Sequence, residues 1–255
     1  MICDSHIHVG YYPRLSCNGE LFYYSPARIA RLMKHCGINS FIFSSTNVVW
    51  DFRARAMHLE AQELLRLCPN QAHAFFWCSL KYLKYDPNLK ELPDFYEGLK
   101  IHGGESNWLA HPRLLRRLLS LAQERNWPVQ IHMGKVSCDG GTIAEWEPVC
   151  KSFPQIRFNL AHCQPIDEAM PILLRNPNFF ADVAFMSIDN FKRIQNIKFE
   201  NQLMFGSDLP VQQRFSSTGL THYFKQTLKI YQKNLLISSA KFLSGNFFRF
   251  LNGDC

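Results

Sequence analysis

The chain has 255 residues, of which 47% are hydrophobic, so it can bury one large core. Its formal charge of +7 comes from Lys and Arg residues scattered without a long basic run, which disfavours nucleic acid as a partner and favours small anionic substrates. Nine cysteines without a paired framework, together with the absence of an 18-residue apolar run and of a secretory leader pattern, predict a reduced cytoplasmic protein with no membrane partner.

Apolar strand-like runs alternate with helix-like segments along the whole chain. Helices are indicated at residues 25–37, 51–67, 111–126, 141–154, 167–177, 187–197 and 238–253. The helix at 25–37 shows the expected signals, because it opens with a serine and a proline and closes on a glycine. Strands are predicted at residues 2–9, 38–45, 73–80, 97–104, 128–134, 156–163, 179–185 and 202–210.

Eight strands alternating with helices predict an α/β fold of the (β/α)₈ TIM barrel type, with residues 1–255 forming a single domain. A doubly wound open sheet is the alternative. It is disfavoured because no glycine-rich phosphate loop follows the first strand.

Polar residues gather where five of these strands end. In a barrel of this type the carboxyl ends of the strands form the active face, so these side chains are expected to converge on one mouth. The residues are His6, His8, Lys100, His102, His132, His162 and Asp208.

The spacing of His6 and His8 indicates two imidazoles on one side of a strand, because residues i and i+2 share a face. Two such imidazoles can bind one divalent ion. Imidazoles with a carboxylate suit zinc, with manganese and iron as alternatives, and Asp208 could both ligate the ion and accept a proton from water. A single histidine is more often a structural residue than a metal ligand. We assign a structural or surface role to the five other histidines, which are His35, His58, His73, His111 and His222.

The ordered motifs resemble the amidohydrolase superfamily, and within it the amidohydrolase-2 branch related to aminocarboxymuconate-semialdehyde decarboxylase. The resemblance covers nearly the whole chain. Its motifs are "DSHIHVG" at residues 4–10, "GLKIHGG" at 98–104, "PVQIHMG" at 128–134, "FNLAHC" at 158–163, "MFGSDLP" at 204–210 and "SGNFFRF" at 244–250.

The resemblance implies that His6, His8, His132 and Asp208 bind the metal. His162 would be an acid/base group in a one-metal site, or a ligand of the second ion in a two-metal site. One ion is favoured, because the motif around Lys100 is similar to the branch that uses one; a carboxylated Lys100 bridging two ions is the alternative. As an ordinary cation, Lys100 would pair with Asp208 or with a substrate carboxylate, and His102 would contact substrate.

The leading functional hypothesis is a hydrolase in which a metal-activated water attacks an amide, ester or lactone of a small molecule, with Asp208 and His162 as catalytic residues. Non-oxidative decarboxylation of a small carboxylic acid is the close alternative, for which Arg14, Arg53 and Arg214 are candidate carboxylate-binding residues. A barrel that has lost catalysis and only binds is a third hypothesis.

Five aromatic residues crowd the segment that follows the first strand. They would either close over a ligand or form the surface of a homodimer. They are Tyr11, Tyr12, Phe22, Tyr23 and Tyr24.

Overall fold

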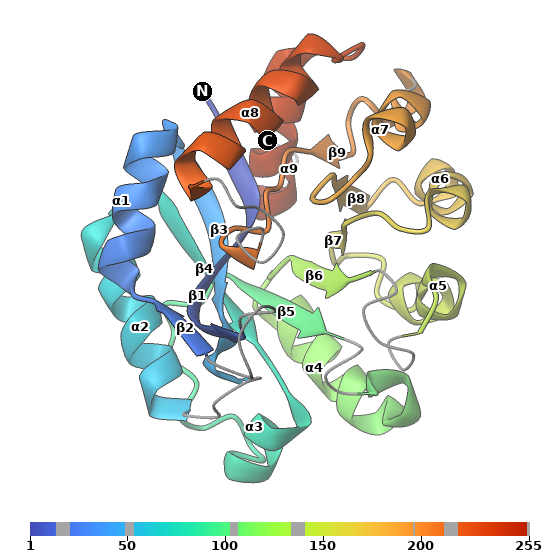
Figure 1. Ribbon diagram of the computed structural model, residues 1–255. Helices are drawn as coiled ribbons and strands as arrows, with labels where there is room; N and C mark the ends of the chain where they lie inside the picture. The colour runs from blue at the N-terminus through green and yellow to red at the C-terminus, as the bar shows by residue number, and fades with distance from the viewer. Residues whose placement is uncertain are drawn as a thin grey trace.

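The computed structural model describes residues 1–13, 21–48, 54–102, 107–133, 141–195, 197–211 and 219–253, which form parallel strands enclosed by an outer ring of helices (Figure 1). Neighbouring parallel strands follow one another in chain order. They are β1 (Cys3–Pro13), β3 (Ser40–Ser45), β4 (Ala72–Trp77), β5 (Gly98–His102), β6 (Val129–His132), β7 (Phe158–Ala161), β8 (Phe179–Asp182) and β9 (Leu203–Met204).

The sheet closes on itself because the chain after β9 runs beside β1. The amide of Ser5 donates to the carbonyl oxygen of Phe205 at 3.0 Å, and the amide of His8 donates to that of Leu209 at 2.7 Å. Ile7 and Leu209 also form a parallel bridge. The predicted (β/α)₈ barrel is therefore confirmed, and the open doubly wound sheet is wrong.

Helices connect the strands, and local sequence signals set their ends. The Ser25 hydroxyl accepts a hydrogen bond from the amide of Arg28, and Gly37 ends the same helix in the left-handed region at φ 72°. The helices are α1 (Pro26–Cys36), α2 (Ala54–Leu67), α3 (Leu80–Tyr85), α4 (Pro112–Glu124), α5 (Ile143–Lys151), α6 (Ile166–Arg175), α7 (Ile188–Ile194), α8 (Leu220–Lys233) and α9 (Asn246–Asn252). Short 3₁₀ turns cover Thr46–Val48, Trp108–Ala110 and Ile197–Phe199.

Two helices were not predicted. Helix α8 buries Leu220, Phe224, Leu228 and Tyr231, a spacing of three or four residues that typifies one helical face. Helix α3 begins where the predicted third strand was expected to continue, because the Ser79 hydroxyl caps the amide of Tyr82. The predicted helix at 238–253 is divided into a π-helical turn at Lys241–Gly245 and the α-helix α9.

Strand β1 extends beyond the barrel and pairs with the antiparallel strand β2 (Leu21–Tyr24), which forms a hairpin at the ligand-bearing end. Gly10 sits at φ 109°, and a Cβ there would lie 2.7 Å from Oδ1 of Asn47. In the hairpin the rings of Tyr11 and Tyr23 lie 4.7 Å apart between centroids. The side chain of Tyr12 lies outside the described residues, and the choice between a lid and a dimer surface stays a prediction.

A small apolar cluster fills the amino-terminal end of the barrel. Phe75 and Phe180 from the strands pack with Phe247, Phe250 and Leu251 of α9. The described cysteines are buried and free of disulfides, as predicted. No helix in the described part of the chain combines the length and apolar character needed to cross a membrane.

The apolar cluster occupies the amino-terminal end of the barrel, and the polar site residues lie at the opposite, carboxyl end of the strands.

Candidate metal centre

The seven predicted site residues lie together at the carboxyl ends of the strands. Strand β1 carries His6 and His8, β5 ends with Lys100 and His102, and β6 ends with His132. His162 follows β7 directly, and Asp208 follows β9. The residues thus converge on one mouth, as the strand pattern predicts.

The first group in this cluster is His6, His8 and Asp208, all buried. Nε2 of His8 lies 2.9 Å from Oδ1 of Asp208, and Nε2 of His6 lies 3.4 Å from the same oxygen. The potential ligand atoms of these residues all lie within 4.8 Å of one another. Ser44 sets the orientation of His8, because its hydroxyl lies 3.0 Å from Nδ1 and leaves Nε2 facing the carboxylate.

The second group is His132 and His162, whose Nδ1 and Nε2 atoms, respectively, lie 3.2 Å apart. Nδ1 of His162 lies 3.3 Å from the carbonyl oxygen of Ala184, which can only accept a hydrogen bond. Nδ1 of His162 is therefore a donor, and with a single ring proton on Nδ1 the Nε2 atom of His162 accepts from Nδ1 of His132. This leaves a lone pair on Nε2 of His132, a buried atom without a hydrogen-bond partner.

Asp182, at the end of β8, is a fully buried site residue that sequence reasoning missed. Its Oδ2 lies 3.3 Å from Nδ1 of His6, and its Oδ1 accepts the backbone amide of His162 at 3.0 Å. Burial raises the pKa of Asp182, but His6 and His162 outweigh burial and hold the pKa below its usual range. An acid ending the apolar run "FFAD" was the signal that could have identified it.

The potential ligand atoms of Asp182, His6 and His162 also lie within 4.8 Å of one another, but we interpret Asp182 as a supporting residue from the side of His6 that it faces. It faces Nδ1 of His6, whereas Asp208 faces Nε2 of the same ring. A carboxylate that accepts from one imidazole nitrogen orients the ring and strengthens the other nitrogen as a metal ligand. Asp182 thus directs His6 towards Asp208.

Asp4, the acid of the first motif, holds the two ligand-bearing segments together. Its Oδ1 accepts the backbone amide of His6 at 3.1 Å and that of Ser207 at 2.9 Å. Ser207 directly precedes Asp208, so Asp4 fixes β1 against the segment that carries the carboxylate. Burial raises the pKa of Asp4 to about 7.

Lys100 is completely buried and contacts His6 rather than pairing directly with Asp208. Its Nζ lies 3.0 Å from Nε2 of His6. Burial lowers the pKa of Lys100 to about 8, although Asp208 and Asp182 favour its charged form. The ammonium group of Lys100 thus contacts the same nitrogen of His6 that faces Asp208.

A stack of three rings forms one wall of the site. The rings of His102 and His132 lie 3.9 Å apart between centroids, and Trp77 stacks on the other face of His102 at 5.5 Å. Trp77 ends β4 and was not predicted. Burial lowers the pKa of His102 to about 3 and takes that of His132 well below its usual value, so both rings are neutral.

Four residues around the mouth have left-handed backbone conformations, which residues other than glycine adopt rarely. These are His162 at φ 71°, Cys163 at 48°, Phe185 at 59° and Asp208 at 54°. Strained backbone of this kind collects where a fold must aim particular side chains. Two of the four are candidate ligands or proton carriers.

The remaining predicted residues lie elsewhere or outside the described chain. Arg14, Arg53 and Arg214 lie outside the described residues. His58 is held between the hydroxyls of Tyr82 and Tyr96, and His73 binds Glu97. These contacts agree with the structural roles assigned to both histidines.

The donor set fits a divalent cation. Burial lowers the pKa of His6 to about 4 and also lowers the pKa of His8, so the two imidazoles that face Asp208 are neutral. Asp208 is ionised, because His6, His8 and His162 outweigh burial and lower its pKa, and its Oδ1 faces Nε2 of both His6 and His8. Neutral nitrogen ligands around an unneutralised carboxylate oxygen suit zinc and other first-row divalent ions.

Comparisons with known proteins show the family and the fold of the chain. A family model described as amidohydrolase matches residues 96–231, more than half of the chain. The match includes Lys100, His102, His132, His162 and Asp208. No curated protein matches the chain significantly in sequence.

Solved structures with the same fold are distant in sequence. An amidohydrolase from Burkholderia multivorans with bound zinc is 14% identical at a TM-score of 0.68, over 98% of this chain and 99% of that one. Amidohydrolase 2 from Bifidobacterium longum is 14% identical with the same TM-score, over 99% of both chains. A 4-oxalomesaconate hydratase from Rhodopseudomonas palustris is 14% identical at 0.68, over 98% of this chain and 95% of that one. These similarities establish the fold, and the fold carries more than one reaction.

Proposed function

The chain belongs to the amidohydrolase family, and from this premise we propose that it is a metal-dependent hydrolase acting on an amide, ester or lactone of a small molecule. The observation that carries the proposal is the buried contact of both β1 imidazoles with Oδ1 of Asp208. His6, His8, His132 and Asp208 would hold the ion, with zinc favoured and manganese or iron as alternatives. When bound, a divalent ion supplies Lewis-acid activation of water and of the substrate carbonyl.

The residues provide the proton transfers that hydrolysis needs. Ionised Asp208 accepts a proton from the attacking water. Its Oδ2 lies 3.9 Å from Nε2 of His162, so His162 would exchange that proton with Asp208, and serve the leaving group, through one water molecule. Lys100 and His102 line the same site and would contact the substrate.

Non-oxidative decarboxylation is a second candidate, favoured by one observation. Lys100 is a fully buried cation in the site, and a substrate carboxylate would neutralise it. In this reaction Lys100 would hold the carboxylate, and His162 would deliver the proton that replaces carbon dioxide.

Metal content of the purified protein tests the proposal, measured in the wild type and in the His8→Ala and Asp208→Ala variants. We expect about one ion per chain in the wild type and loss of the ion from both variants, with His35→Ala, an exposed histidine on α1, unchanged. A wild type that binds no divalent ion and gains no melting temperature with zinc or manganese would contradict the proposal. Product analysis on panels of esters, lactones, amides and carboxylic acids then separates hydrolysis from release of carbon dioxide.

A further inference from the structure

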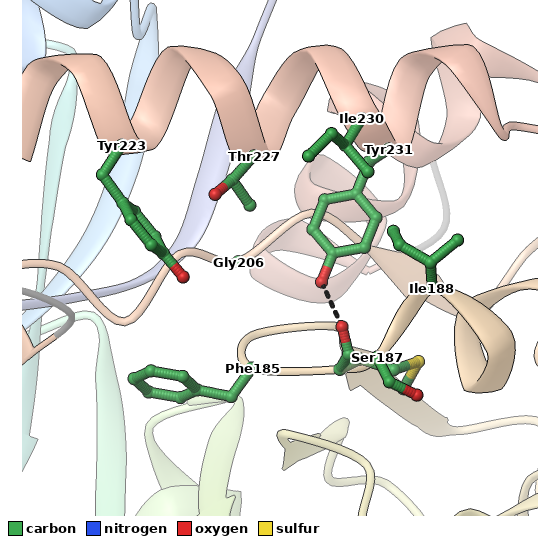
Figure 2. A pocket seen from close by; sticks show the side chains of 9 residues that line it. Phe185, Ser187, Ile188, Gly206, Tyr223, Thr227, Ile230 and Tyr231 are labelled. Carbon is green, nitrogen blue, oxygen red and sulfur yellow. Dashed lines mark hydrogen bonds between the residues drawn. The ribbon is translucent and has the colours of Figure 1, made fainter. Parts of the chain in front are cut away.

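A cavity of about 270 Å³ lies beside the metal centre, between α8 and the segment that joins β8 to α7 (Figure 2). Phe185 forms its lower wall in the view, and Tyr223, Thr227 and Tyr231 reach into it from α8. The backbone of Gly206, two residues before Asp208, forms another part of the lining. All of its lining residues belong to the described part of the chain.

The cavity differs chemically from the metal centre. Its lining contains aromatic, aliphatic and hydroxyl side chains, and none of the lining residues is charged. By contrast, the adjoining site holds Lys100, Asp182, Asp208 and several imidazoles. The cavity is open to solvent on one side, where Phe185 and Ile230 are exposed, and it favours uncharged groups because a charged group would lose part of its hydration there without gaining a partner.

Two residues connect the cavity with the candidate catalytic groups. The ring of Phe185 lies 5.8 Å from that of His162 between centroids. Gly206 lies directly against the buried acid, because a Cβ there would come within 2.8 Å of Cβ of Asp182. Phe185 and Gly206 thus belong both to the cavity lining and to the surroundings of the candidate catalytic groups.

The hydroxyl groups in the cavity are of two kinds. That of Tyr231 is engaged, because it donates to the carbonyl oxygens of Val183 and Met186 at 2.9 Å each. Those of Tyr223 and Thr227 form no hydrogen bond within the described residues, and Figure 2 shows the Tyr223 hydroxyl directed towards the cavity. Tyr231 thus builds the wall, whereas Tyr223 and Thr227 can bind a polar substituent.

We propose that this cavity is a substrate subsite for an uncharged, ring-sized limb, which lies over Phe185 with a polar substituent at Tyr223 or Thr227. The inference rests on the proposed function, since it names the class of molecule that the metal centre would act on. A closed cavity of about 150 Å³ accommodates benzene, so the larger volume here fits one ring with a short substituent. The substrate would then combine a reactive carbonyl with a neutral aromatic or cyclic limb.

Binding of benzamide to the holoprotein tests the subsite, and acetamide is the matched probe that lacks the ring. The affinity of each probe is measured by ligand-observed NMR titration. We expect benzamide to bind the wild type at least about tenfold more tightly than acetamide. Thr227→Phe and Ile230→Trp, which fill the cavity, should weaken benzamide binding by about tenfold or more. Gln226→Phe places the same ring on the exposed side of α8 and should leave the affinity unchanged.

The metal content and melting temperature of each variant show that it is folded. Equal benzamide affinity in the wild type and in both filled variants would overturn the subsite, as would equal affinity for acetamide and benzamide. Asp208→Ala should keep benzamide binding, and its loss there would place the ring at the metal centre and overturn the inference. Failure of the proposed function is distinguished from these results, because it would be seen as absence of bound metal and of hydrolysis while benzamide still binds.

Discussion

Nζ of Lys100 lies 3.0 Å from Nε2 of His6, the same imidazole nitrogen that faces Oδ1 of Asp208 at 3.4 Å. An ammonium group donates to a lone pair, and this lone pair is the one with which His6 would bind a metal. Lys100 and a divalent ion therefore compete for one atom, and they also repel each other as cations.

This competition predicts the effect of Lys100→Met. Removing the ammonium should raise the affinity for a divalent ion by at least about tenfold, because unit charges about 4 Å apart repel by about 4 kcal/mol at an effective dielectric constant of about 20 and loss of the Lys100 proton can relieve only part of this repulsion. Metal analysis should still find one ion per chain. If Lys100 were instead carboxylated and bridged two ions, the substitution would lower the metal content, so competitive metal titration separates the two hypotheses.

Asp182→Asn tests the supporting carboxylate. Asparagine keeps the shape but loses the charge that faces Nδ1 of His6, so metal affinity should fall by about 10–100-fold. A part of the folding stability should also be lost, since Oδ1 accepts the amides of His162 and Ala184. Asp189→Asn, at the exposed start of α7, is the matched control. Unchanged metal affinity in Asp182→Asn would mean that Asp182 acts on the fold alone.

Gly10→Ala tests the hairpin at the mouth. Gly10 lies at φ 109°, and a Cβ there would meet both Oδ1 of Asn47 and Oγ1 of Thr46 within 3 Å. We expect a loss of about 1–3 kcal/mol, which lowers the melting temperature by several degrees. Gly219→Ala should lower it less, because a Cβ at Gly219 meets no atom within 4 Å and only the N-cap preference of α8 for glycine over alanine is lost. Equal melting temperatures for both variants would show that the hairpin adapts readily.

The barrel could be predicted because its strands are short, largely apolar runs that alternate with helical segments, with polar residues at or just after several strand ends. The convergence of His132, His162 and Asp208 followed from that topology, since the carboxyl ends of barrel strands meet. Asp182 was missed because "FFADVAF" was read only as a buried strand, and nothing local shows that its acid meets His6 from β1.

Other features depend on packing that one sequence does not reveal. The proton positions on His132 and His162 follow from the Ala184 carbonyl, which is distant from both along the chain. The cavity was invisible because α8 builds one of its walls, and α8 itself was not predicted. A stack such as Trp77 on His102 likewise depends on the register between β4 and β5.

The ion pair between Glu147 and Arg175 predicts a pH-dependent part of the stability. Hydrogen bonds from Arg175, together with those from Asn176 and Lys151, lower the pKa of Glu147 to about 2 from its ordinary value of 4.5, against the opposing effect of burial. The carboxylate therefore stabilises the fold fully above pH 4.5. This contribution is lost as the pH falls from 4.5 through 2, where the folded protein also takes up the proton.

Glu147→Gln removes this contribution, and the difference from the wild type should depend on pH. Because about half of Arg175 faces solvent, we expect only about 1 kcal/mol at neutral pH, or a few degrees in melting temperature. The gap should be constant from pH 7 to 5 and narrow as the pH falls towards 2, since protonated Glu147 resembles glutamine. Melting curves across this range check it, and a gap that stayed constant down to pH 2 would show that the lost stability comes from packing rather than from charge.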